Sequence, residues 1–314
     1  MKDMELEKLA ASLKISGQYR ITQKYLRPEY YHIDDHCQKF TGVFLDLETT
    51  GLDHANDKII ELGMVRFEYS QDGRIFRILD DYNQYSDPGI PIPPFITQLT
   101  GISDEMLKGQ HFNLLDIENY LKNVNLIISH NAQFDRGFFE IAFPSILQKP
   151  WACSMKDIDW KSEGFESCKL EYIAYKYEFF YEGHRAIIDC LAGIHILSKL
   201  LPKSQKLVFS EVLDNCRKVI FKLWATGAPY AHKDLLKKRG YKWDKPNFAK
   251  TQAWSIELRK NEVKDELSFL REEIYGDNVD LPIDIIDAYT RFSNLAIVSE
   301  PEKYKNELEW IKLL

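Results

Sequence analysis

Apolar residues recur with a period of two in short runs along the first half of the chain, and this pattern predicts β-strands. The runs lie at about 42–49, 58–69 and 73–82, with further apolar segments at 126–129 and around Trp151. Apolar residues at helical spacing predict helices at about 133–142, 168–177 and 186–200. Strands first, then alternating helix and strand, indicate an α/β fold with a mixed β-sheet flanked by helices.

The same pattern divides the chain into three parts. Residues 1–39 read as a helical N-terminal lead with an apolar stripe of Leu6, Leu9 and Leu13. Residues 40–203 contain the predicted sheet. Beyond Pro202-Lys203-Ser204 the chain changes character, and residues 204–314 are expected to form a smaller, mainly helical accessory domain.

Two carboxylates stand close together on the first predicted strand. In Val43-Phe-Leu-Asp46-Leu-Glu48, the period of two places Asp46 and Glu48 on the same face of the sheet. Two like charges at this spacing repel each other, so the arrangement needs a bound cation or a proton on one of them. Two isolated carboxylates in this pattern are more often exposed at a sheet edge, so further residues are needed to distinguish a metal site from an exposed edge.

Further polar side chains follow in apolar surroundings. Asn131-Ala-Gln-Phe-Asp135 comes after the strand at 126–129, and His184-Arg-Ala-Ile-Ile-Asp189 opens the helix predicted from 186. Small residues one turn from Asp189, at 186, 192 and 193, leave room beside its carboxylate for an ion and a phosphate. Unpaired charges in apolar segments are costly, which favours one shared site over three unrelated coincidences.

These runs resemble the three motifs of the DEDDh exonuclease superfamily, in order and with plausible spacing. Asp46–Leu52 followed by Ile59–Gly63 is similar to the first motif, and His130–Asp135 to the second. In the third motif the histidine of this branch stands five positions before the last aspartate, as His184 does before Asp189. The tyrosine branch would need Tyr at the position of Arg185. The resemblance covers about residues 42–201.

This resemblance implies a ribonuclease-H-like fold and a role for each matching residue. Oxygen ligands for two Mg²⁺ or Mn²⁺ ions would come from Asp46, Glu48, Asp135 and Asp189, and His184 would be the general base. The residues expected to bind the terminal nucleotide are Thr49, Thr50, Gly51, Leu52 and Asn131, with Leu52 as a wedge against the bases. For Thr50 and Gly51, a plain strand-to-turn connection is an equally good interpretation.

The predicted function is that of a 3′–5′ exonuclease that releases nucleoside monophosphates from the 3′ end of single-stranded DNA in repair, proofreading or turnover. One alternative is an RNA-processing exoribonuclease or oligoribonuclease, and another is a phosphoesterase of small nucleotides. A third is a catalytically idle subunit that binds nucleic acid or a partner. DNA is favoured by similarity to the proofreading epsilon subunit of DNA polymerase III. A homodimer and a polymerase or repair partner both stay open.

Composition refines the expected partners. The formal net charge of −7 argues against tight binding to long duplexes but not against a grip on a few nucleotides. Residues 217–245 are locally basic and carry Trp224, Tyr230, Tyr241 and Trp243, which suits either single-strand binding or the core of a small domain. Five cysteines without close pairing, no signal-peptide pattern and no membrane-length apolar run favour a cytoplasmic protein.

Overall fold

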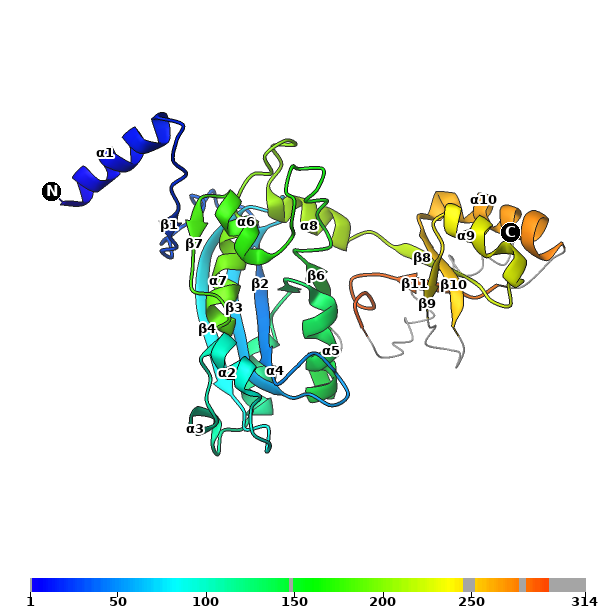
Figure 1. The fold of residues 1–314 in the computed structure, drawn as a ribbon, viewed down its shortest axis with the longest axis horizontal. Coiled ribbons are helices and arrows are strands. Elements are labelled where there is room, and N and C mark those ends of the chain that lie inside the picture. The colour runs from blue at the N-terminus through cyan, green and yellow to red at the C-terminus, as the bar shows by residue number, and fades with distance from the viewer. Residues whose placement is uncertain (1, 147–148, 245–251, 277–280, 294–314) are drawn as a thin grey trace. The chain divides into compact units, whose positions relative to one another are not determined.

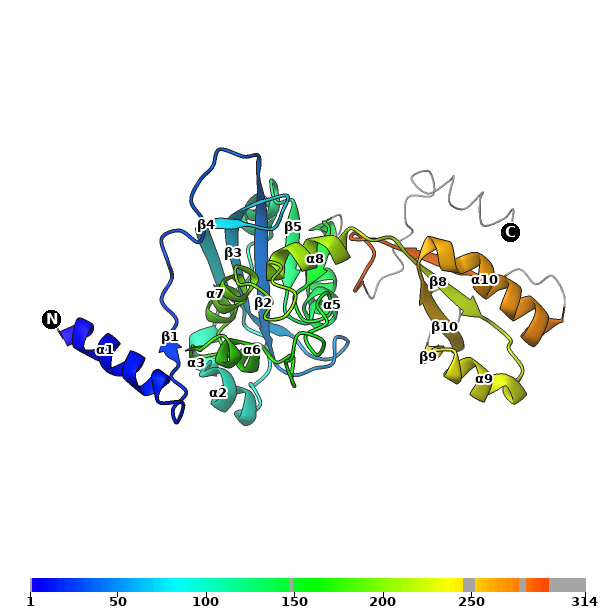
Figure 2. The ribbon, with the colours of Figure 1, turned by 90° about the horizontal axis from the view of Figure 1, so that it is seen from above.

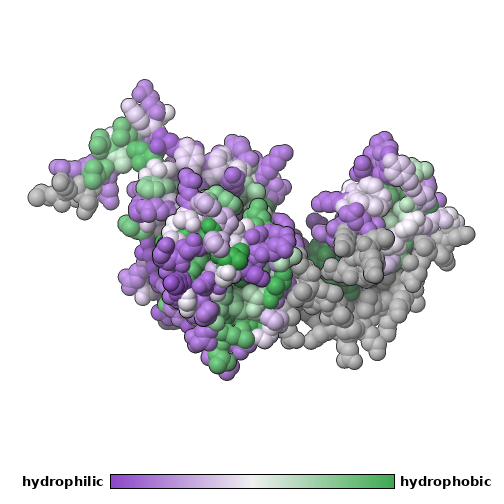
Figure 3. Space-filling view, turned by 60° about the horizontal axis from the view of Figure 1, so that its bottom comes forward, coloured by the Kyte–Doolittle hydropathy of each residue, from purple (hydrophilic) through white to green (hydrophobic). Residues whose placement is uncertain are grey.

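The computed structural model describes residues 2–146, 149–244, 252–276 and 281–293 (Figure 1). The chain forms two compact units, Met1–Asn215 and Cys216–Leu314. Within the described residues, every helix falls short of the length and apolar character needed to cross a membrane. The face of the first unit seen in Figure 3 mixes hydrophilic and apolar areas. Phe95 and Leu99 are among the exposed apolar side chains of this unit.

A five-stranded mixed sheet forms the centre of the first unit, in the order β4-β3-β2-β5-β6. Its strands are β2 (Lys39–Thr49), β3 (Ile59–Ser70), β4 (Ile75–Tyr85), β5 (Leu126–Ser129) and β6 (Trp151–Cys153). The first three are antiparallel neighbours, whereas β5 runs parallel to β2 and β6 parallel to β5. This arrangement confirms the predicted α/β fold with a mixed sheet flanked by helices.

Helices cover the sheet where the sequence predicts them. In both ribbon views α5 (Ala132–Ala142) and α7 (Ala186–Leu197) lie on either side of β2 (Figures 1 and 2). Gly193 of α7 sits directly on the Phe44 ring of β2, which leaves no space for a side chain at position 193. The other helices of this unit are α2 (Pro94–Thr100), α3 (Asp104–Leu107), α4 (Leu114–Leu121), α6 (Leu170–Lys176) and α8 (Val208–Cys216).

The N-terminal lead is helical only in its first part. Helix α1 (Lys2–Ile15) leaves Leu6 and Leu9 exposed, so the expected apolar stripe is not packed into the core. The following segment is extended and pairs β1 (Gln23–Lys24) with β7 (Phe179–Phe180). Aromatic rings of this segment pack against α7, since the ring centroids of Tyr25 and Tyr31 lie 5.0 Å and 5.8 Å from that of His195.

The second unit contains a sheet that the sequence analysis did not predict. Four strands are antiparallel in the order β11-β8-β10-β9. They are β8 (Ile220–Ala225), β9 (Lys242–Asp244), β10 (Ala253–Leu258) and β11 (Ile283–Ile286), accompanied by α9 (Lys233–Lys238) and α10 (Lys260–Leu270). The expectation of a mainly helical domain was therefore wrong. Its strands have only 3 to 6 residues, too short for the period of two to stand out.

Candidate active site

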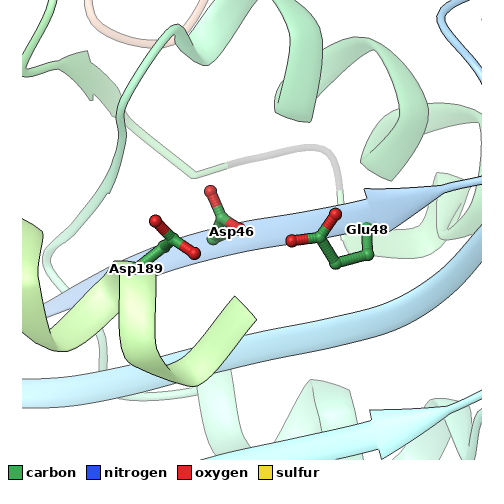
Figure 4. A group of neighbouring side chains, drawn as sticks. All are labelled: Asp46, Glu48 and Asp189. Carbon is green, nitrogen blue, oxygen red and sulfur yellow. The ribbon is translucent and has the colours of Figure 1, made fainter. Parts of the chain in front are cut away.

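Three of the predicted carboxylates meet at the face of β2 that carries α7. Carboxylate oxygens of Asp46, Glu48 and Asp189 all lie within 4.8 Å of one another. Figure 4 shows the first two along one side of β2, with Asp189 reaching toward them from α7. The alternation of the strand and the placement of α7 against β2 bring these groups together, as the sequence predicted.

Burial and mutual repulsion raise the pKa of each of these carboxyl groups. Burial first and the neighbouring charges of Asp189 and Glu61 next raise the pKa of Glu48 to about 8, although Arg185 opposes the shift. Burial likewise raises the pKa of Asp189 to about 6, against backbone hydrogen bonding from Arg185. For Asp46, burial followed by the charges of Asp189, Asp135 and Glu48 raises the pKa well above its usual range.

Asp135 is the fourth predicted ligand and comes from α5. Its side chain is buried, and burial raises its pKa well above the ordinary value, while hydrogen bonds donated by backbone N–H groups, including that of Leu47, oppose the shift. Asn131, at the start of α5, has a left-handed backbone with φ of 76°. A left-handed non-glycine residue at a strand-to-helix junction often marks a functional site. Asp135 thus belongs to the same electrostatic cluster without joining the tight group of three.

The acidic group fits a divalent cation. Closely spaced carboxylate oxygens are the ligands that Mg²⁺, Mn²⁺ and Ca²⁺ prefer. The raised pKa values indicate that the negatively charged forms of these carboxyl groups are destabilised in the folded chain. A bound cation would relieve this repulsion and displace the protons.

His184 stands beside this group on the turn before α7. Its backbone is left-handed with φ of 63°, and its side chain is about half exposed. The Nε2 atom lies 3.7 Å from Oε1 of Glu171 in α6. The next residue, Arg185, donates its backbone N–H to Asp189 Oδ2 at 3.2 Å, so His184 directly precedes a residue bound to this carboxylate. An exposed imidazole beside the carboxylates is placed where a substrate could reach it.

Of the predicted nucleotide-binding residues, Asn131 lies at the start of α5, whereas the other four lie at the end of β2 and in the tight turn that follows it. Asp57 holds this turn, because its carboxylate accepts hydrogen bonds from Thr50 Oγ1 and from the Asp53 backbone N–H, each at 2.9 Å. The Thr49 hydroxyl donates to the Gly51 carbonyl. Leu52 is left 81% exposed at this turn. Thr49 and Thr50 are buried, so the turn presents mainly Leu52 and backbone groups.

Several residues around the site were not assigned a role from the sequence. Glu61 of β3 is fully buried and forms an ion pair with Arg185. The Tyr181 ring packs beside the acidic group, where burial first and the Asp189 charge next raise the pKa of its hydroxyl. A signal for Glu61 was present, because a charged residue inside the apolar run Ile59-Ile60-Glu61-Leu62 must find a buried partner.

Comparison with known proteins identifies the domain that carries this site. A family model described as Exonuclease matches residues 43–197, which include every site residue discussed above from Asp46 to Asp189. This domain belongs to the exonuclease family. The prediction of a DEDD-type exonuclease domain is thereby confirmed. The exonuclease family depends on divalent metal ions, and the acidic group offers a possible site for them.

Relatives of the exonuclease domain include much longer proteins. A DNA polymerase III PolC-type of Caldanaerobacter subterraneus subsp. tengcongensis is 28% identical over 200 residues, which are 59% of this chain and 14% of that protein. The DNA polymerase III PolC-type of Bacillus subtilis is 31% identical over 170 residues, 51% of this chain and 11% of that protein. The matched region thus spans about a seventh or less of these relatives' length.

Solved structures with a similar exonuclease domain share little sequence with this chain. Exonuclease X in complex with 5′ overhanging duplex DNA has a TM-score of 0.39 and 20% identity, covering 54% of this chain and 99% of that one. E. coli exonuclease I in complex with a dA16 oligonucleotide has a TM-score of 0.45 and 15% identity, covering 88% of this chain and 70% of that one.

The raised pKa values predict an unusual dependence of stability on pH. In the folded exonuclease domain Glu48 and Asp189 keep protons to about pH 8 and pH 6, whereas in the unfolded chain both lose them near pH 4. Between these limits the folded state binds more protons, so its free energy of unfolding falls as pH rises. We expect Glu48→Gln in EDTA to be more stable than wild type at pH 8 by on the order of 2 kcal/mol, and to differ little at pH 4.5.

Calorimetric melting of both proteins at the two pH values measures this difference. Saturating Mn²⁺ should raise the melting temperature of wild type at pH 8 more than that of Glu48→Gln. A wild type that is the more stable protein at pH 8 in EDTA would contradict the repulsion between these carboxylates.

Proposed function

We propose that this chain is a 3′–5′ exonuclease that removes nucleoside monophosphates from the 3′ end of single-stranded DNA with two divalent cations. The observation that carries the proposal is the meeting of Asp46, Glu48 and Asp189 in one group, with His184 beside it. This arrangement brings together cation ligands and a group that can move a proton, which phosphodiester hydrolysis requires.

Each residue would have a distinct task in this reaction. The four carboxylates Asp46, Glu48, Asp135 and Asp189 would hold the cations, which, when bound, neutralise the charge that develops on the phosphate. His184 would take the proton from the attacking water. The half-exposed side chain of His184 leaves it access to solvent, and Glu171 Oε1 at 3.7 Å would stabilise the imidazolium that forms.

The turn after β2 would receive the terminal nucleotide. Leu52, which Asp57 keeps exposed by holding the turn, would pack against the last bases. The backbone of Thr49 to Gly51, together with Asn131, would bind the terminal sugar and phosphate. DNA is favoured because the two relatives named above are DNA polymerases, while an exoribonuclease would use the same residues.

A time course with end-labelled oligonucleotides tests this proposal. Wild type with Mn²⁺ is incubated with matched 5′-labelled single strands of DNA and RNA, and Asp46→Ala serves as control. We expect a ladder that shortens from the 3′ end, fastest on DNA and absent with Asp46→Ala. Faster digestion of RNA would establish the exoribonuclease instead. If the protein digests neither strand and also fails to hydrolyse mononucleotide esters, a catalytically idle binding subunit is favoured.

We further propose that the second unit holds the single strand. The aromatic residues of this unit divide between its core and its surface, because Trp224 and Tyr241 are buried whereas Tyr230 and Trp243 are 79% and 53% exposed. Of the basic residues, Lys222 and Arg239 are paired with Asp244 and Glu266. Exposed lysines remain beside the exposed rings in sequence, at 237, 238 and 242. Exposed rings and cations together suit bases and phosphates.

Substitution of these exposed groups should weaken capture of the strand more than turnover. Loss of one stacking ring in Trp243→Ala should raise KM for a 20-nucleotide DNA strand about five-fold or more, with kcat within two-fold. The variant Lys237→Gln/Lys238→Gln/Lys242→Gln should make KM less dependent on salt. Lys264→Gln, an exposed lysine on α10, is the matched control and should behave as wild type. An unchanged KM in the first two variants would refute this role of the second unit.

A further inference from the structure

Glu61 is a buried carboxylate that is not a member of the group formed by Asp46, Glu48 and Asp189. It lies on β3, directly opposite Glu48 of β2 and opposite Tyr85 of β4. Its side chain is fully buried and accepts hydrogen bonds from Asn83 Nδ2 at 2.9 Å and from the Arg185 guanidinium, through Nε at 3.3 Å and Nη2 at 3.2 Å. Arg185 also donates to the Tyr85 hydroxyl. A buried carboxylate with this many donors is firmly placed.

The same carboxylate caps helix α7. The first N–H groups of a helix have no partner within it, and a side-chain oxygen at the N-cap position normally accepts one of them. Arg185 occupies this position in α7 and has no oxygen to offer. Instead, Oε2 of Glu61 accepts from the Ala186 N–H at 3.2 Å. A negative charge at this end also interacts favourably with the helix dipole.

Close packing fixes the distance between this helix end and the sheet. A Cβ atom added to Gly63, two residues after Glu61, would lie 2.6 Å from the Ala186 Cβ and 2.8 Å from the Ile187 nitrogen. The start of α7 therefore rests directly on β3. Arg185 is held by its side chain at Glu61, and its backbone N–H donates to Asp189 Oδ2 at 3.2 Å. His184 is its neighbour in the chain.

We propose that Glu61 is a positioning residue for the reaction: by binding both the Arg185 guanidinium and the Ala186 N–H, it fixes the start of α7 and with it the placement of His184 and Asp189 relative to Asp46 and Glu48. The inference rests on the proposed function for its effect on turnover. Its structural part, the anchoring of α7, stands without that function.

The variants Glu61→Gln and Asp80→Asn test this role in the full chain. Gln keeps the shape of the side chain but loses the charge and presents an N–H₂ group to donors. Asp80 is the matched control, because it binds Arg66 through two hydrogen bonds across the same strands, β3 and β4, without any bond to α7. Arg185→Lys, which keeps the charge but not the two-pronged hydrogen bonding, replaces Glu61→Gln if that variant does not fold.

Turnover, substrate binding and amide exchange are measured for each protein. We expect Glu61→Gln to lower kcat about ten-fold or more, with KM for the oligonucleotide and the apparent Mn²⁺ affinity each within about three-fold, because misplacement of reacting groups affects the chemical step. Amide exchange at Ala186–Asp189 should accelerate. Asp80→Asn should change neither kcat nor exchange at α7, even where its melting temperature falls.

The outcomes separate this inference from the proposed function. An inactive wild type with accelerated exchange in Glu61→Gln would refute the exonuclease and keep the anchor. An active wild type whose kcat and α7 exchange are unchanged by Glu61→Gln would refute the positioning role alone. An equal loss of kcat in Asp80→Asn would also overturn it, since the effect would then come from the strand pair in general.

Discussion

Asp46→Ala is expected to abolish nucleotide release while making the metal-free protein more stable. Desolvation, followed by the charges of Asp189, Asp135 and Glu48, raises the pKa of the Asp46 carboxyl well above its usual range. Removal of this ligand should lower kcat by about three orders of magnitude or more. Asp46 would help hold the cations that neutralise the charge developing on the phosphate, and the remaining acids cannot neutralise that charge themselves. Without metal, the same substitution removes repulsion, so the melting temperature at pH 8 in EDTA should rise by roughly 5 °C.

Two measurements check this prediction, namely release of labelled nucleotide with Mn²⁺ and thermal melting in EDTA. Asp116→Ala, an exposed aspartate on α4, controls for loss of a negative charge and should leave both unchanged. Unfolding of Asp46→Ala at room temperature would mean that the carboxylate is structural. Retained activity would remove Asp46 from the site altogether.

His184→Ala is expected to lower kcat by about two to four orders of magnitude and to leave Mn²⁺ binding nearly intact. The imidazole is not among the three side chains whose ligand atoms form the acidic group. Loss of the base should therefore affect proton transfer rather than the affinity for the cation.

Calorimetric titration with Mn²⁺ beside single-turnover kinetics measures the two effects separately. His111→Ala is the control for loss of an exposed imidazole on the same unit and should match wild type in both assays. A parallel loss of Mn²⁺ binding in His184→Ala would identify His184 as a ligand and refute its role as general base. Unchanged kcat would leave the reaction without an assigned base.

The parts of this protein that could be predicted from sequence are those that depend on local periodicity. Asp46 and Glu48 share a face because any strand alternates, and Asp189 follows His184 at a spacing fixed by the start of a helix. Glu61 and Arg185 could not be paired in this way, since 124 residues separate them and only the packing of α7 on β3 joins them. Glu171 reaches His184 from a third element for the same reason.

In the second unit, even residues close together in the sequence could not be interpreted correctly from the sequence. Lys222 and Trp224 were considered as parts of a basic, aromatic binding segment, but they are alternate residues of one face of β8. Phe221 and Leu223, which point the other way, belong to the core of this unit. In so short a strand, a lysine and a tryptophan two positions apart carry no local signal that distinguishes a sheet face from a ligand site.

The contact between Gly193 and the Phe44 ring bears on how relatives of this domain should be judged. A side chain at position 193 would clash with the buried Phe44 ring, and we expect α7, which carries Asp189, to shift relative to β2, although every acid and the histidine would still be present. A homologue that retains all five of these residues but has a bulky residue at this glycine is therefore expected to be inactive. Retention of the acidic residues alone is not a sufficient criterion for classifying such a homologue as a working nuclease.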